Sequence, residues 1–178
     1  MLAKFLDAAG VNTITSLRFT AGTSSLSFRY CDTKIGTPRL TATGATLQAS
    51  QIETVNASAA ASIAFQQQPA SVYANAPILP MVKVLDVFGN VVPGVAVTLT
   101  LSPMSVPGMT TGSTPVLSGP NALTDVTGLA SFPTSSVNLP GTYTVTASML
   151  INGHLLMTPA SMVFTITPNP TATTKKVR

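Results

Sequence analysis

Short runs in which apolar and polar residues alternate limit the fold of this chain more than any other feature. Successive side chains of a β-strand point to opposite faces, so this alternation predicts strands with one buried face. Clusters of Gly, Pro and Asn separate the runs, as expected for tight turns between antiparallel strands. The clearest runs are Leu17–Phe19, Leu26–Tyr30, Val82–Leu85, Val95–Leu101, Thr142–Ala147 and Met162–Ile166. The pattern predicts an all-β, immunoglobulin-like antiparallel sandwich.

The low charge of the chain supports this prediction and limits its chemistry. Only 8% of the 178 residues are charged, too few to coat the outer faces of several helices. The acid, histidine and thiol groups are Asp7, Asp32, Glu53, Asp86, Asp125, His154 and Cys31. This set is small for acid–base catalysis or metal binding, so we expect no cofactor and no metal site. A single cysteine excludes a disulfide within the chain.

The distribution of charge and apolar residues also limits the partners of the chain. Three of the nine basic residues lie in the last four positions, and the others are too dispersed to form a nucleic-acid-binding face. No run approaches the ~18 apolar residues of a membrane-spanning helix. We therefore expect neither a nucleic-acid partner nor membrane insertion.

Two segments of the chain repeat. Ser25–Phe28 followed by Gly36–Ala42 parallels Leu129–Phe132 followed by Gly141–Ala147. Phe132 lies 104 residues after Phe28, and Gly141 lies 105 residues after Gly36. A spacing near ~100 residues is typical of tandem immunoglobulin-type sandwiches.

The repeat predicts a truncated domain followed by a complete one. Residues 1–57 hold only the later strands of a sandwich, at Leu26–Tyr30, Pro38–Thr43 and Thr46–Thr54. A joint of small residues follows at 58–61, and residues 169–178 form a basic tail that we expect to be disordered. The complete domain, 62–168, has predicted strands at Ile63–Gln66, Ile78–Asp86, Val95–Leu101, Leu129–Phe132, Gly141–Ser148 and Ser161–Thr167.

Several phrases resemble tandem immunoglobulin-like repeats of very large bacterial surface proteins of the invasin and adhesin type. These are SSLSFRYCDTKIGTPRLTA (Ser24–Ala42), FQQQPA (Phe65–Ala70), VKVLDVFGN (Val82–Asn90) and GTYTVTA (Gly141–Ala147). The residues from Tyr30 to Pro38 match the phrase that closes one such repeat, except that Cys31 stands where the pattern has a different residue. The resemblance covers nearly the whole chain. It implies a non-catalytic spacer or adhesion module and carries over no catalytic residue.

Acidic residues next to glycines mark the predicted turns. A short acceptor side chain at the start of a turn accepts backbone N–H bonds while Gly adopts positive φ. The residues in these structural roles are Asp32, Gly36, Asp86, Gly89, Asn90, Asp125, Gly128 and Gly141. Calcium binding is the alternative for these acids, but calcium takes ~6–8 oxygen ligands, and the acids are scattered along the chain.

His154 is the weak catalytic candidate, if the protein is an enzyme at all. It follows Asn152-Gly153, a preferred hairpin turn, and we expect it in an exposed loop between the last two strands. No nucleophile motif, zinc motif or phosphate loop accompanies it. The sequence therefore weighs against an enzyme.

The truncated domain is expected to expose an apolar face, because three strands with one bare face are marginal alone. Its residues are Leu26, Phe28, Tyr30, Leu40, Leu47 and Ile52. We expect this face to pack on strands formed by residues 1–20 or on a second copy of the chain, by strand swapping or edge pairing. An exposed Cys31 could link two copies through a disulfide.

The sequence therefore predicts a structural spacer or adhesion module of an extracellular bacterial protein. The alternatives are a small hydrolase built on the sandwich, or a module that binds a glycan or protein ligand. Lys4 and Asp7 interrupt the only N-terminal stretch that could act as a signal peptide. The expected location is the cell surface or beyond if the chain belongs to a longer exported protein, and the cytoplasm otherwise.

Overall fold

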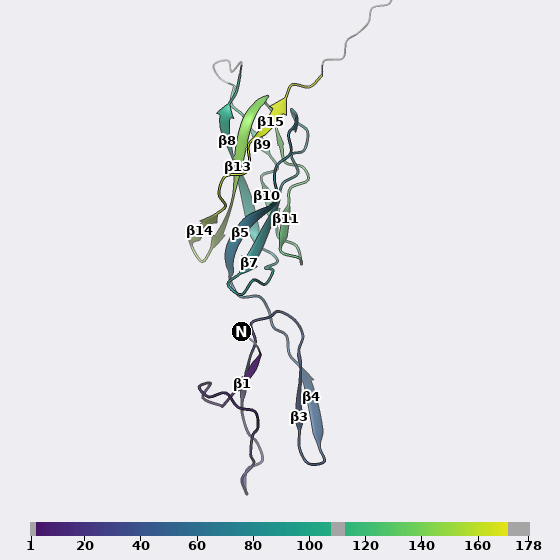
Figure 1. Cartoon of the computed structure of the whole chain (residues 1–178), viewed down its shortest axis with the longest axis vertical. Helices are drawn as coiled ribbons and strands as arrows, with labels where there is room; N and C mark the ends of the chain where they lie inside the picture. The colour runs from purple at the N-terminus through teal and green to yellow at the C-terminus, as the bar shows by residue number, and fades with distance from the viewer. Residues whose placement is uncertain (1–2, 108–112, 171–178) are drawn as a thin grey trace, which may run out of the picture. The chain divides into compact units, whose positions relative to one another are not determined.

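The computed structural model describes residues 3–107 and 113–170, which divide between two compact units. Unit 1 is Met1–Ser58 and unit 2 is Ala59–Arg178. The described residues form strands and turns with no helix (Figure 1), so no helix among them could cross a membrane. From residue 171 onward the predicted basic tail lies outside the described residues.

Unit 2 is a sandwich of two main sheets whose strands pair antiparallel, except for β6, which pairs with β15 in parallel. The larger has the order β10-β8-β13-β15-β6, with β14 also paired to β13, and the smaller has the order β11-β7-β5. A short ladder of β9 and β12 completes the unit. The bounds are β5 Ala60–Gln67, β6 Val72–Tyr73, β7 Met81–Asp86, β8 Ala96–Ser105, β9 Leu117–Ser118, β10 Asn121–Leu123, β11 Leu129–Ser131, β12 Ser136–Val137, β13 Gly141–Ile151, β14 His154–Met157 and β15 Phe164–Thr167.

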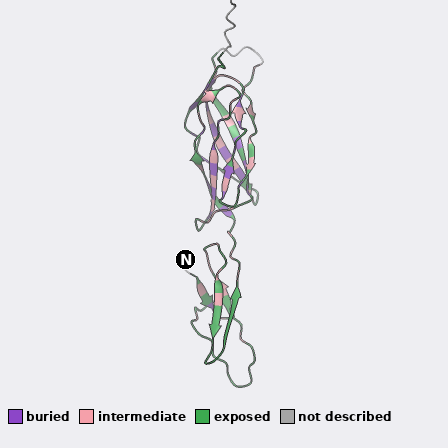
Figure 2. Ribbon diagram, turned by 90° about the vertical axis from the view of Figure 1, so that its right-hand side faces the viewer, coloured by how far each residue is buried: buried purple, intermediate pink, exposed green. Residues whose placement is uncertain are grey.

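Alternation along the strands produces the core of this sandwich. In β13, every second residue from Gly141 to Met149 is buried, and β7 alternates in the same way. Figure 2 shows the buried residues gathered along the strands of unit 2. The fully buried side chains include Ile78, Val82, Val84, Val97, Val137, Tyr143, Val145, Phe164 and Ile166. Burial of each large side chain contributes roughly 1.5–3 kcal/mol.

Tyr143 identifies the sandwich as immunoglobulin-like in detail. Its ring is completely buried at the start of β13, and its hydroxyl donates to the carbonyl of Leu139 at 2.9 Å. A buried Tyr at the start of this strand, bonded to backbone a few residues upstream, is the tyrosine corner of such folds. The predicted fold class, all-β and immunoglobulin-like, is therefore confirmed for unit 2.

Unit 1 consists of two separate antiparallel pairs of strands. β1 (Lys4–Leu6) pairs with β2 (Arg29–Cys31), and β3 (Arg39–Thr43) pairs with β4 (Gln48–Ile52). Among the described residues of this unit, Leu6 is the one buried hydrophobic side chain. Most residues of these strands are exposed, in contrast to unit 2 (Figure 2).

The structure corrects several predicted elements. Leu17–Phe19 is not a strand, because none of the described strands pairs with this segment, and Leu17 and Phe19 are 44% and 59% exposed. The strand predicted at Leu26–Tyr30 is β2, which begins only at Arg29. Ala60 and Ala61 of the predicted joint already belong to β5, since Ala60 is buried in the core of unit 2.

Candidate functional site

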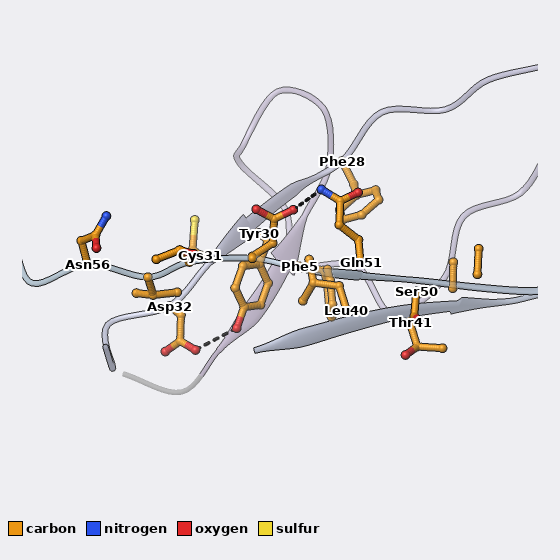
Figure 3. A pocket seen from close by; sticks show the side chains of 15 residues that line it. Phe5, Phe28, Tyr30, Cys31, Asp32, Leu40, Thr41, Ser50, Gln51 and Asn56 are labelled. Carbon is orange, nitrogen blue, oxygen red and sulfur yellow. Dashed lines mark hydrogen bonds between the residues drawn. The ribbon is translucent and has the colours of Figure 1, made fainter. Parts of the chain in front are cut away.

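Unit 1 contains an open groove, hereafter the unit 1 groove, with a volume of about 890 Å³. Both strand pairs of unit 1 contribute to it, and Figure 3 shows Phe5, Tyr30, Leu40 and Gln51 close together among its lining side chains. Its lining residues are Phe5, Phe28, Tyr30, Cys31, Asp32, Leu40, Thr41, Ala42, Ala49, Ser50, Gln51, Glu53, Thr54, Val55 and Asn56.

Three aromatic rings form one wall of the unit 1 groove. The ring of Phe5 lies 5.6 Å from that of Phe28 and 5.4 Å from that of Tyr30, in edge and tilted arrangements. Such pairs contribute roughly 0.5–1.5 kcal/mol beyond the area they bury. Phe5 and Phe28 nevertheless remain 36% and 44% exposed. The cluster is therefore an apolar surface open to water.

The polar groups of the unit 1 groove carry negative charge. The hydroxyl of Tyr30 donates to Asp32 at 2.8 Å, and the amide of Gln51 donates to Glu53, as the dashed lines in Figure 3 show. The backbone N–H of Lys34 and the Tyr30 hydroxyl hold the pKa of Asp32 below its ordinary value of 3.8. The same carboxylate raises the pKa of Tyr30. Two carboxylates and no Lys, Arg or His side chain line the groove.

One edge of β3 borders this groove and is open. Glu53 N donates to Pro38 O at 3.0 Å and Gly44 N donates to Leu47 O at 2.8 Å, so even-numbered residues of this strand bond toward β4. Because the bonding direction alternates along an antiparallel strand, the N–H and C=O groups of Arg39, Thr41 and Thr43 point away from β4. In the described parts of the chain, β4 is the one strand paired with β3. An exposed edge of this kind is a template for another strand.

The structure brings together only part of the predicted apolar face. Phe28, Tyr30 and Leu40 line the groove, whereas Leu26, Leu47 and Ile52 do not. Ile52 pairs with Arg39, so its side chain lies on the face of the hairpin opposite Leu40. Leu47 is 79% exposed in the turn between the two strands.

Phe5 is the aromatic groove residue that sequence reasoning missed. The run Lys4-Phe5-Leu6 is only three residues long, too short to stand out as a strand. The available signal was a second repeat, because Lys4, Leu6, Asp7 and Gly10 match Lys83, Leu85, Asp86 and Gly89 in spacing.

Three loops of the chain share one hydrogen-bond pattern, which accounts for most of the acids. In each loop an Asp carboxylate accepts the N–H of the residue four positions later, and the Gly three positions later donates its N–H to the Asp carbonyl. Each Gly has positive φ, between 72° and 84°. The loops begin at Asp7, Asp86 and Asp125. The sequence predicted the turns at Asp86 and Asp125 and missed the one at Asp7.

The remaining predicted structural residues occupy ordinary backbone positions. Asp32 Oδ1 accepts the Lys34 N–H at 3.0 Å, and Gly36 forms a two-way backbone bridge with Val55. Gly141 lies so close to Ser105 O that a Cβ atom would come within 2.6 Å of it. These residues shape turns and strand ends.

His154 is exposed, as predicted, but it lies at the start of β14. The sequence pattern had indicated a loop between the last two strands. It pairs with Ile151 across a hairpin whose turn residues, Asn152 and Gly153, both have positive φ. The carboxylates of Asp86 and Asp125 are occupied within their own loops. The described residues hold no group of three or more His, Cys, Asp or Glu side chains arranged to bind a metal.

The chain shows only weak similarity to known proteins. No protein-family model matches the chain, and no curated protein matches it. A solved structure described as the D00-D0 domain of Intimin aligns with 91% of this chain and 77% of its own, at 15% sequence identity and a TM-score of 0.37. The immunoglobulin-like assignment above rests on the strand order and the tyrosine corner of unit 2 itself.

Proposed function

We propose that this chain is a non-catalytic structural and adhesion module of an extracellular bacterial surface protein, and that two copies associate through unit 1. The motif resemblance of Ser24–Ala42 and Val82–Asn90 to repeats of such proteins supports the surface role. The loops that occupy the carboxylates of Asp86 and Asp125 are consistent with a scaffold whose polar groups serve its own turns.

One observation carries the association, namely the unit 1 groove with its exposed aromatic wall. Aromatic side chains are enriched at protein–protein contacts, so a groove that exposes Phe5 and Phe28 is a candidate contact site. Two-stranded pairs are marginally stable alone, so a contact that covers Phe5, Phe28 and Leu40 would also stabilise the unit. Burial of such a surface gives both a driving force and a place for association.

A settling assay with displayed protein tests the adhesive role. Bacteria that do not aggregate on their own would display the chain on their surface, and their sedimentation would be followed over time. We expect the displayed chain to accelerate settling and Leu40→Asp to abolish this effect, because the substitution places a charge inside the apolar groove. Leu47→Asp is the matched control, since Leu47 lies outside the groove lining and should leave settling unchanged. Settling equal to that of bacteria without the chain contradicts the proposal.

A further inference from the structure

Unit 1 contains a second copy of one strand and turn of unit 2, namely β7 and the turn that follows it. β1 matches β7 in sequence, and the turns after both strands share the Gly N–H bond to the Asp carbonyl and the bond from the residue four positions later to the Asp carboxylate. The turn after β1 is one residue longer, since Asp7 N donates to Asn12 O whereas Asp86 N donates to Asn90 O. After each turn the chain returns along its strand: Ile14 N donates to Phe5 O at 3.0 Å, and Val92 N donates to Val84 O at 3.2 Å. Isolated antiparallel bridges, Leu6 with Thr13 and Leu85 with Val91, complete the match.

The residues that follow the turn are exposed in unit 1 but buried in unit 2. If Ile14 corresponds to Val92, then Leu17 and Phe19 correspond to Val95 and Val97. Val95 is 9% exposed and Val97 is completely buried, where β8 begins. Leu17 and Phe19 are 44% and 59% exposed. Ser16–Thr20, hereafter the donor segment, therefore has the pattern of a first half of β8 but no partner strand in the described structure.

The strand edge to which such a segment would pair is the unpaired edge of β3. Gly36–Ala42 repeats Gly141–Ala147, so β3 corresponds to the part of β13 that pairs with β8. In β13, the carbonyls of Val145 and Ala147 accept the N–H groups of Ser161 and Thr158, which follow β14 in the chain. The backbone groups of Thr144 and Thr146 point to the other edge of β13, where β8 pairs. The corresponding edge of β3 is the open one.

The donor segment fits this groove in size and pattern. Its apolar residues Leu17 and Phe19 alternate with Arg18. An antiparallel pairing that puts Leu17 and Phe19 on the Leu40 face therefore leaves Arg18 on the opposite face of the sheet. The small side chains of Ala42 and Ala49 leave room beside Leu40 for a large apolar residue.

The donor segment is poorly placed to fill the groove of its own chain. Its start is fastened to β1 through Ile14, and Thr20 and Thr23 close a turn directly after it, with Thr23 N donating to Thr20 O at 3.0 Å. If the register of β8 on β13 is continued, Phe19 of the same chain falls opposite Gly44 and Leu17 opposite Thr46, beyond the end of β3. A segment from another copy is free of its own chain's connections at both ends, so it can lie four residues further along β3 and place Phe19 opposite Leu40.

We infer that two copies of this chain exchange donor segments, each adding Ser16–Thr20 as an antiparallel strand to the open edge of β3 in the other copy. Phe19 then lies opposite Leu40, Leu17 opposite Ala42, and Arg18 opposite Thr41. The inference rests on the proposed self-association and specifies the strand that mediates it. The exchange is closed and two-fold, because each copy gives and receives one strand.

Disulfide trapping tests the exchange in the full chain. One preparation carries Arg18→Cys, a second, longer by a tag, carries Thr41→Cys, and both carry Cys31→Ser. Directly opposite residues in an antiparallel pair have Cα atoms about 5.5 Å apart, within the roughly 4.4–6.8 Å that a disulfide spans. We expect the mixture, after mild oxidation, to give a covalent product of one short and one tagged copy. Thr100→Cys with Cys31→Ser replaces the donor as control, since Thr100 is exposed in unit 2.

The outcomes separate the exchange from association in general. A mixed covalent dimer well above the control supports the exchange. A noncovalent dimer of the unmodified chain in light scattering, with no mixed product above the control, overturns the exchange and leaves self-association standing. A monomeric unmodified chain overturns both. A single chain carrying Arg18→Cys, Thr41→Cys and Cys31→Ser that oxidises to a compact monomer shows docking within one copy, and also overturns the exchange.

Discussion

The Cα of Gly128 lies against the backbone of Val84, in the loop that joins the two sheets of unit 2. Val84 N donates to Gly128 O at 2.9 Å, and a Cβ atom on Gly128 would come within 2.9 Å of Val84 O. The φ of Gly128 is +72°, which side chains other than Gly rarely adopt. Conformation and space therefore both require Gly here.

Gly128→Ala is accordingly expected to lower the free energy of unfolding by about 2–4 kcal/mol. Urea unfolding followed by circular dichroism measures the loss. Gly89→Ala is the matched control, because Gly89 has a similar φ of +84° but nothing within 4 Å of its Cβ position. It should lose only the conformational part, about 1–2 kcal/mol. Equal losses in the two variants would show that the contact with Val84 has no effect on stability.

Tyr143→Phe is expected to destabilise unit 2 by about 1–2 kcal/mol, since it leaves the carbonyl of Leu139 without the hydroxyl donor. The ring itself still fills the core. Tyr73→Phe serves as the control, because Tyr73 is 52% exposed and its substitution should change the unfolding midpoint little. If both variants unfold at the same urea concentration as the unsubstituted chain, the tyrosine corner contributes nothing to stability.

Acid is expected to weaken the loop that begins at Asp125. Hydrogen bonds from Thr127, first from its side chain, and from Leu129 hold the pKa of Asp125 below its ordinary value of 3.8. A depressed folded-state pKa stabilises the fold above the unfolded-state value, and this contribution disappears as the pH falls through the folded-state pKa. Asp125→Asn keeps an oxygen acceptor but cannot titrate.

The urea midpoint of the unsubstituted chain should therefore fall more steeply below about pH 4 than that of Asp125→Asn. Unfolding series between pH 2 and pH 7, run on both proteins, give the comparison. Parallel curves would mean that the Asp125 carboxylate has the same pKa in the folded and unfolded chain.

Phe19→Ser is expected to weaken association of two copies at least tenfold without lowering the urea midpoint of a dilute sample. Phe19 is 59% exposed in the single chain, so its loss removes an intermolecular contact and no core packing. Sedimentation equilibrium measures the dissociation constant. Val126→Ser, at an 84% exposed position of unit 2, should leave association unchanged. An unchanged dissociation constant for Phe19→Ser would exclude Phe19 from the contact.

Sequence reasoning succeeded where long alternating runs meet a complete sandwich. The runs at Val95–Leu101 and Thr142–Ala147 correspond to β8 and β13, whose alternate residues form the core. It failed for β6 and β12, since two residues show no period, and for β14, where neither Leu155 nor Leu156 alternates with a polar residue.

The candidate site was only partly predictable for a different physical reason. Phe28, Tyr30 and Leu40 follow the strand alternation and could be assigned to one face. Leu47 was misassigned because it falls in a turn, and Ile52 because the register of the hairpin decides which face it joins. Leu17–Phe19 has the pattern of a strand, but pattern alone does not show whether a partner strand is present.

The molar mass of the unmodified chain in solution decides whether two copies associate through unit 1. Size-exclusion chromatography with light scattering, over protein concentrations from about 1 to 100 μM, spans the affinities usual for weak and moderate dimers. We expect the measured mass to rise with concentration from the monomer mass of 18.3 kDa toward twice that value. A mass that stays at 18.3 kDa over the whole range would contradict association through unit 1.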